Sequence, residues 1–103
     1  MFRLFALLSI LACYVPALAD EYVCTNNDTV RSISVEYEHA GWKVPCKVRY
    51  HKPTEGGATE YPWSAAATPG YCEEKAAFLA GKLENWGWQC ERYRDAESEE
   101  ERN

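Results

Sequence analysis

The sequence has few of the residue patterns from which catalytic and metal sites are built. Its only histidines are His39 and His51, and no cluster of further metal ligands adjoins either one. The cysteines show no C-x-x-C spacing, and there is no G-x-S-x-G motif. Zinc sites and nucleophilic catalysis both need several such groups in one place. We therefore expect a protein that is not an enzyme and that uses no metal and no cofactor.

Basic charge and long apolar runs are also scarce. Lysine and arginine number 11 against 16 aspartates and glutamates, which gives a formal net charge of -5. Nucleic acid is therefore not an expected partner, because domains that bind it are usually basic. The most apolar segment, residues 4–15, is shorter than the roughly 20 residues that a membrane-spanning helix requires. No transmembrane segment is predicted, and nothing in the sequence indicates an oligomeric state.

The N-terminal segment has the features of a secretory signal peptide. Arg3 precedes the apolar run, and the sequence ALA at positions 17–19 has the form of a cleavage site. We interpret residues 1–19 as a signal peptide and expect the mature chain to begin at Asp20, in the periplasm or outside the cell. Alternatively, the sequence ILAC that ends at Cys13 resembles a lipobox, and cleavage there would leave a lipid anchor on this cysteine.

Removal of the signal peptide would leave an even number of cysteines: Cys24, Cys46, Cys72 and Cys90. In an exported chain, this predicts two disulfide bonds. The core of a domain of this size stabilises the folded state only marginally. Each disulfide would stabilise the folded state by roughly 2–4 kcal/mol. Residues 20–93 contain no repeat or linker and are interpreted as one disulfide-stapled domain. Residues 94–103 hold five acidic side chains and no large apolar one, which predicts a disordered acidic tail.

The first half of the predicted domain alternates between apolar and polar residues with a period of two. In residues 30–38, Ile33, Val35 and Tyr37 fall on one face, while serines and glutamates fall on the other. Residues 44–51 repeat this alternation. Such a pattern is typical of strands with one buried face.

Two shorter segments complete the predicted sheet. Residues 22–25 end at a turn rich in Asn and Asp, and residues 59–65 follow a turn rich in glycine. Pro62 cannot donate to a strand ladder, so the segment that contains it belongs at an edge. Together the four segments predict an antiparallel meander.

The period then changes to that of a helix. Residues 72–86 carry apolar side chains spaced four, three, four and three apart, which form one stripe facing the sheet: Cys72, Ala76, Leu79, Leu83 and Trp86. Gly87 suits the end of the helix, and residues 88–93 read as a final strand. The fold class is therefore α+β, with an antiparallel meander of four short strands, one amphipathic helix packed on it, and a last strand.

The pairing of the cysteines follows from the reach of the chain. A helix from Cys72 to Trp86 rises roughly 21 Å, and the returning strand recovers only about 10 Å of that by Cys90. A disulfide needs Cα atoms within about 7 Å, so these two cysteines are not expected to pair. With the last strand beside the first, the preferred pairs are Cys24–Cys90 and Cys46–Cys72. The alternative, Cys24–Cys46 with Cys72–Cys90, requires a helix that begins late or bends.

The candidate contact residues are two tryptophans and two basic side chains. Trp42 falls in a turn and Trp63 on the predicted edge strand, where burial is difficult, and partly exposed tryptophans often mark protein or carbohydrate contacts. Lys47 and Arg49 belong to a basic row on the polar face of the second long strand. This row could meet an anionic polymer or an acidic partner, or glutamates on the facing strand could neutralise it.

The segments VRSISVEY, VPCKVRY, YPWSAA and GYCEEKAAFLAGKLENWGWQC together resemble a family of small exported proteins of Gram-negative bacteria. The resemblance covers nearly all of residues 22–91 and implies a periplasmic setting, but no activity. A weaker likeness links Tyr22-Val23-Cys24 and Val35-Glu36-Tyr37 to periplasmic inhibitors of C-type lysozyme. The inhibitory S-G-x-x-Y loop of that family is absent.

These observations predict an exported, non-enzymatic binding protein of the bacterial periplasm. Its partner would be a periplasmic or cell-envelope protein, or a polysaccharide. The alternative is an inhibitor of a cell-wall hydrolase such as lysozyme.

Overall fold

The structure is a computed structural model that describes residues 21–93. The predicted signal peptide at 1–19, the alternative lipid anchor at Cys13 and the predicted acidic tail at 94–103 lie outside the described residues.

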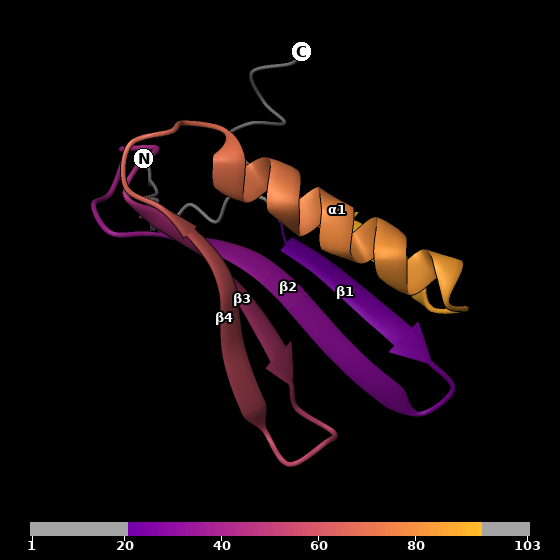
Figure 1. The fold of residues 1–103 in the computed structure, drawn as a ribbon. Helices are drawn as coiled ribbons and strands as arrows, with labels where there is room; N and C mark the ends of the chain where they lie inside the picture. Colours follow the sequence, from indigo (N-terminus) through magenta and orange to yellow (C-terminus); the bar gives the residue numbers. More distant parts are fainter. Residues whose placement is uncertain (1–20, 94–103) are drawn as a thin grey trace, which may run out of the picture.

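Five antiparallel strands form one sheet in the order β4-β3-β2-β1-β5. Figure 1 labels β4, β3, β2 and β1 of this sheet. The strands are β1 (Glu21–Asn26), β2 (Thr29–Tyr37), β3 (Cys46–Lys52), β4 (Ala58–Ala65) and β5 (Gln89–Tyr93), and the helix α1 (Tyr71–Asn85) precedes the last of them. The predicted meander and the predicted place of the last strand beside the first are both confirmed. The strand that contains Pro62 lies at an edge, as its missing N–H requires.

Local chemistry explains where the strands begin and turn. Asn27 has φ 58°, a left-handed conformation that asparagine tolerates, and it allows a tight turn between β1 and β2. The second long strand begins at Cys46, two residues later than the alternation predicts. Pro45 has no N–H for the ladder, and its carbonyl instead accepts a hydrogen bond from the N–H of Glu38 at 3.0 Å.

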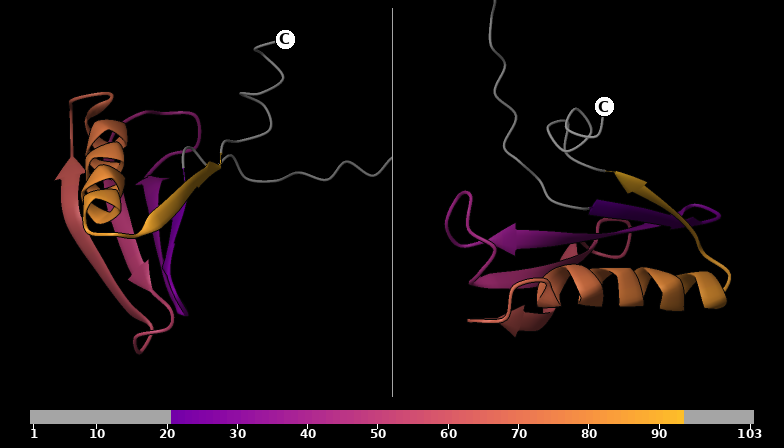
Figure 2. Two further views of the ribbon diagram at one scale, coloured as in Figure 1. Left: turned by 90° about the vertical axis from the view of Figure 1, so that its right-hand side faces the viewer. Right: turned by 90° about the horizontal axis from the view of Figure 1, so that it is seen from above.

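The helix covers one face of the sheet and leaves the other face uncovered by any described residue (Figure 2). The core lies between these two layers and consists of Tyr22, Cys24, Ile33, Val35, Cys46, Val48, Tyr50, Cys72, Ala76, Leu79, Ala80 and Leu83. Alternation in the two long strands and the four-three spacing in the helix predict nine of these residues, whereas Tyr22, Cys24 and Ala80 are not assigned to the core from the sequence. Within residues 21–93, no helix is long and apolar enough to cross a membrane.

The prediction that Trp86 extends the buried helix stripe is wrong. The helix ends at Asn85, Trp86 is the C-terminal cap residue, and its side chain is 62% exposed. Gly87 follows with φ 100° and turns the chain away from the helix path. Trp88 is the residue that packs against the core instead, since the chain has by then turned back toward the sheet.

Both disulfide bonds have the preferred pairing, Cys24–Cys90 and Cys46–Cys72. The first joins residues that face each other in the ladder between β1 and β5. The second joins the first residue of β3 to the first turn of the helix, with Cα atoms 6.3 Å apart. One bridge thus fixes the last strand to the first, and the other fixes the helix start to the sheet.

Candidate binding surface

The four predicted contact residues lie in three separate places. Lys47 and Arg49 alternate with buried residues of β3 and therefore lie on the uncovered face of the sheet. Trp63 lies on the opposite face, where it is half-buried and packs against the core. Trp42 belongs to the connection between β2 and β3 and is 61% exposed. These residues do not combine into a single surface.

The basic side chains of the uncovered face interact with neighbouring side chains of the sheet. Arg49 Nε lies 3.6 Å from a carboxylate oxygen of Glu36, which is 42% exposed. Lys47 is paired with Glu36 in the strand register, and its ammonium lies 4.5 Å from the centre of the Tyr61 ring. The expected compensation by glutamates on the facing strand is therefore present for Arg49. This face is a mixed, solvated surface rather than a basic one.

A different set of side chains forms a row along one flank of α1 and onto β4. Two of its members, Phe78 and Trp86, are 51% and 62% exposed, whereas two others, Trp63 and Tyr71, are half-buried against the core. Lysines separate the aromatic rings along the helix. We call this row the aromatic–lysine ridge, and its residues are Trp63, Tyr71, Lys75, Phe78, Lys82 and Trp86.

Lys75 connects the half of the ridge near the helix start. Its Nζ lies 5.6 Å from the ring centres of Trp63 and Tyr71 and 5.4 Å from that of Phe78. Trp63 and Phe78 also meet edge to face, with ring centres 6.1 Å apart. These separations fall within the range of about 6 Å for cation–π attraction, so the helix flank and the edge strand form one surface here.

Lys82 continues the ridge to the end of the helix. Its Nζ lies 5.5 Å from the ring centres of both Phe78 and Trp86. Phe78 is thus shared between the two lysines. The exposed rings and the ammonium groups form an uninterrupted array along the whole helix.

The spacing of the ridge residues explains why they share a flank. Tyr71, Lys75, Phe78 and Lys82 each come one position before a buried residue of the core stripe. A helix advances about 100° per residue, so this second stripe lies beside the first, at the border between core and solvent. Long side chains at such a border cover apolar surface while their polar ends reach water.

Charge is divided between the two flanks of the helix. Among residues 21–93, neither Lys75 nor Lys82 forms an ion pair. A helix advances about 100° per residue, which places Glu73 and Glu84 on the flank opposite the ridge. Glu74 lies on the outward side of the helix, between the two flanks. The ridge is therefore a locally positive strip on an acidic protein.

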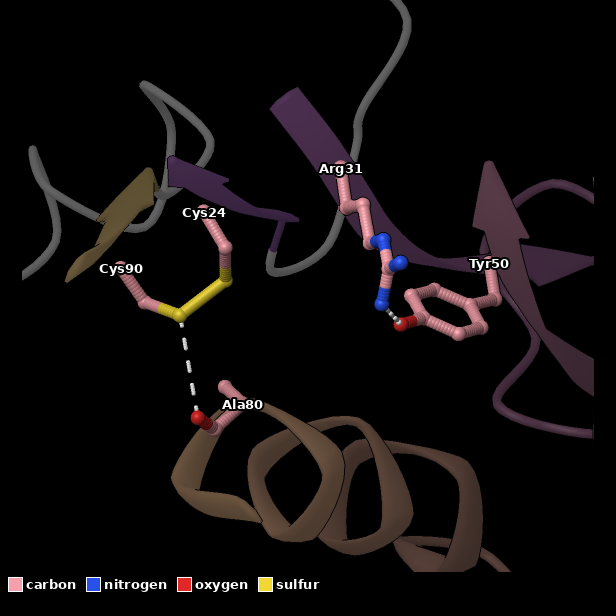
Figure 3. The surroundings of a disulfide bond; sticks show 5 residues. All are labelled: Cys24, Arg31, Tyr50, Ala80 and Cys90. Carbon is pink, nitrogen blue, oxygen red and sulfur yellow. Dashed lines mark hydrogen bonds between the residues drawn. A yellow bond between two sulfur atoms is a disulfide. The ribbon is translucent and has the colours of Figure 1, made fainter. Parts of the chain in front are cut away.

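A separate polar cluster, centred on Arg31, connects side chains of the sheet. Arg31 donates hydrogen bonds of 2.8 and 2.7 Å to the carboxylate of Glu55. It donates another, of 2.9 Å, to the hydroxyl of Tyr50 (Figure 3). Its guanidinium also lies 4.5 Å from the ring centre of Trp88. The bonds to Glu55 raise the pKa of Arg31 above its ordinary value, against the effect of burial. The same bonds hold the pKa of Glu55 below its ordinary value.

The Cys24–Cys90 bridge lies near Arg31 and faces the helix at Ala80 (Figure 3). Cys90 Sγ lies 3.7 Å from the carbonyl oxygen of Ala80. Because a disulfide sulfur has no hydrogen to donate, this approach is a packing contact. Arg31 thus connects side chains of the sheet, the bridge joins β1 to β5 and packs against the helix, and we assign both a structural role.

A shallow hollow of about 480 Å³ lies at the end of the β2–β3 hairpin where β2 ends and β3 begins. Its lining is Glu36, Tyr37, Glu38, Pro45, Cys46, Lys47, Ser64, Ala65 and Ala66. The two glutamates and one lysine give it mixed charge, and it contains no histidine and no free thiol. None of its lining residues belongs to the aromatic–lysine ridge, so the hollow and the ridge are separate features.

The histidines and cysteines, which are often used in catalysis, contact or are bonded to other side chains. His51 Nδ1 lies 2.8 Å from the hydroxyl of Thr59, and the ring of His39 lies 4.7 Å from that of Trp42. All four cysteines between residues 21 and 93 are in disulfides. In the same part of the chain, no three His, Cys, Asp or Glu side chains are grouped so that they could hold a metal ion.

Comparison with known proteins found no matching family model, no matching curated protein and no matching solved structure. The chemistry of the surface itself is therefore the guide to function.

Most of the ridge was missed in the sequence, although a signal for it is present. Of its six residues, only Trp63 was predicted as a contact residue. The stripe at positions 71, 75, 78 and 82 has the same four-three-four spacing as the core stripe, but alternation of aromatic and basic residues makes it less apolar. A search for a second helical stripe, one position before the first, would find it.

Proposed function

We propose that this protein is an exported, non-enzymatic binding protein of the bacterial periplasm that contacts its partner through the aromatic–lysine ridge. The observation that carries the proposal is the continuous exposed array of aromatic rings and unpaired lysines along α1. Exposed aromatic side chains that a charged rim surrounds are typical of interaction surfaces.

The two disulfides support the proposed compartment. Disulfides persist in oxidising environments such as the bacterial periplasm and are rare in the cytosol. A chain with the secretory features of residues 1–19 would form them after export. A rigid, stapled domain also suits a binding role, because a preorganised surface loses little entropy when it binds.

Affinity capture from the cell envelope tests this proposal. The tagged protein, exported and processed by its host, would be used beside its Trp86→Ala and Trp42→Ala variants. These two tryptophans are almost equally exposed, at 62% and 61%, but only Trp86 belongs to the ridge. We expect Trp86→Ala to lose the captured envelope component and Trp42→Ala to retain it. Equal capture by both variants would contradict a binding role for the ridge.

A further inference from the structure

The shape of the aromatic–lysine ridge restricts what can cover it. Tyr71 and Trp86 are fifteen positions apart on one helix flank, which spans roughly 22 Å. Most of the ridge follows the side of one helix, and the hollow at the β2–β3 hairpin contains none of its residues. A small ligand needs a concave site. A row of side chains along a helix instead suits a flat surface that contacts the whole flank at once.

The side chains of the ridge are those that favour the boundary between water and lipid. Tryptophan and tyrosine are enriched at membrane interfaces because one end of each side chain is apolar and the other polar. Phe78 adds an exposed ring without any polar group, which suits shallow contact with acyl chains. Lysines beside such rings can extend their ammonium groups to the headgroups while their methylenes cover apolar surface.

Charge indicates which lipid surface would be bound. Lys75 and Lys82 have no ion-pair partner among the described residues, although the chain as a whole has a net charge of -5. An anionic surface would therefore attract the ridge, although it would repel the net negative charge of the chain. This asymmetry would orient the protein with α1 against the surface, because the acidic flank of the helix faces away from the ridge.

We propose that the aromatic–lysine ridge docks this protein on an anionic phospholipid surface, with α1 parallel to the membrane plane. The inference rests on the proposed function and names the partner for the same surface. Helices that lie in the interface present aromatic side chains to the lipid and lysines to the headgroups. With only two lysines and a few rings, the binding is weak and reversible, and it depends on the ionic strength.

Vesicle co-sedimentation tests the proposal. The exported protein, with both disulfides formed, would be mixed with vesicles of phosphatidylcholine alone or of phosphatidylcholine with phosphatidylglycerol. We expect binding only to the vesicles that contain phosphatidylglycerol, and release in high salt. Since all variants share the same termini, any contribution of residues outside 21–93 cancels in their comparison.

Matched variants locate the binding surface. Each basic residue near an anionic membrane contributes enough that neutralising both Lys75 and Lys82 to glutamine should lower the partition coefficient roughly 30-fold. Lys47→Gln is the control, because Lys47 is also an exposed lysine stacked on an aromatic ring, but on the uncovered face of the sheet. We expect this control to bind like the wild type. Circular dichroism of each variant would verify that the fold is retained.

Three results would overturn the inference. These are no binding to phosphatidylglycerol vesicles at low salt, equal loss in Lys47→Gln and the double variant, or equal binding to both kinds of vesicle. If the protein does not bind vesicles while Trp86→Ala still abolishes capture of an envelope protein, the ridge remains a binding surface and only the lipid assignment is wrong. Ridge-dependent binding to soluble polyglutamate without vesicle binding would likewise replace the lipid with an acidic polymer.

Discussion

Cys24 and Cys90 face each other across adjacent antiparallel strands, with their Cα atoms 3.9 Å apart. Their bridge closes a loop with a sequence separation of 66 residues, whereas the Cys46–Cys72 bridge closes one of 26. The long loop runs from Cys24 in β1 through β2, β3, β4 and α1 to Cys90 in β5. The last strand, which follows the helix, is therefore tied to the strand with which the described chain begins.

Removal of the Cys24–Cys90 bridge should destabilise the protein more than removal of the other bridge. The loop-entropy relation gives about 4.4 kcal/mol for the longer loop and about 3.5 kcal/mol for the shorter one. The double alanine variants Cys24→Ala/Cys90→Ala and Cys46→Ala/Cys72→Ala would be compared by urea denaturation. If the free energy of unfolding fell by less than about 1 kcal/mol in the first variant, the role assigned to this bridge would be contradicted, because loop entropy predicts a much larger loss.

The core and the ridge should respond differently to truncation. Leu83 is fully buried between helix and sheet, so Leu83→Ala should lower the free energy of unfolding by about 2–5 kcal/mol. Phe78 is 51% exposed on the same helix, and Phe78→Ala should cost less than about 1 kcal/mol. Thermal and urea unfolding would measure both. Comparable losses would mean that the ridge is part of the core rather than a free surface.

Two glycines near the helix should show opposite effects. Gly87 has φ 100°, which an L side chain rarely adopts, so Gly87→Ala should destabilise the protein by about 1–2 kcal/mol. Gly81 lies within the helix, and a Cβ there would meet nothing within 4 Å. Gly81→Ala should therefore stabilise the protein by up to about 1 kcal/mol. The same sign for both variants in urea denaturation would contradict the description of the helix end.

Acid should weaken the Arg31–Glu55 pair. The hydrogen bonds from Arg31 hold the pKa of Glu55 below its ordinary value. The pair therefore contributes stability above the ordinary glutamate pKa, and this contribution is lost as pH falls through the lower, folded pKa. An NMR titration of the Glu55 carboxyl should show the lowered pKa, and Arg31→Gln should return it toward the ordinary value. An unchanged titration in the variant would show that Arg31 is not the cause.

The sequence predicts most of the fold because burial in this protein follows simple periods. Ile33 and Val35 alternate as expected, and Leu79 and Leu83 follow the helical spacing. The distance along the helix and back along the strand is enough to choose the cysteine pairs. These features depend on geometry that every helix and strand shares.

The surface was harder to predict because residue type alone does not decide burial at an element's end. Trp86 fits the spacing of the buried stripe, yet the turn at Gly87 leaves it outside. Trp63 is the register partner of Val48, the residue next to Lys47, so Lys47 and Trp63 lie on opposite faces of the sheet. The ridge depends on contacts between β4 and α1, and these contacts follow from how the helix crosses the sheet.

The indole N–H resonances of the four tryptophans test the central claim most directly, because these side chains sample different parts of the molecule. They would be recorded for the protein with both disulfides formed, before and after addition of a solubilised envelope fraction. Binding through the aromatic–lysine ridge predicts that the Trp63 and Trp86 signals shift or broaden while the Trp42 signal stays unchanged. A response confined to Trp42, with Trp63 and Trp86 unaffected, would contradict it.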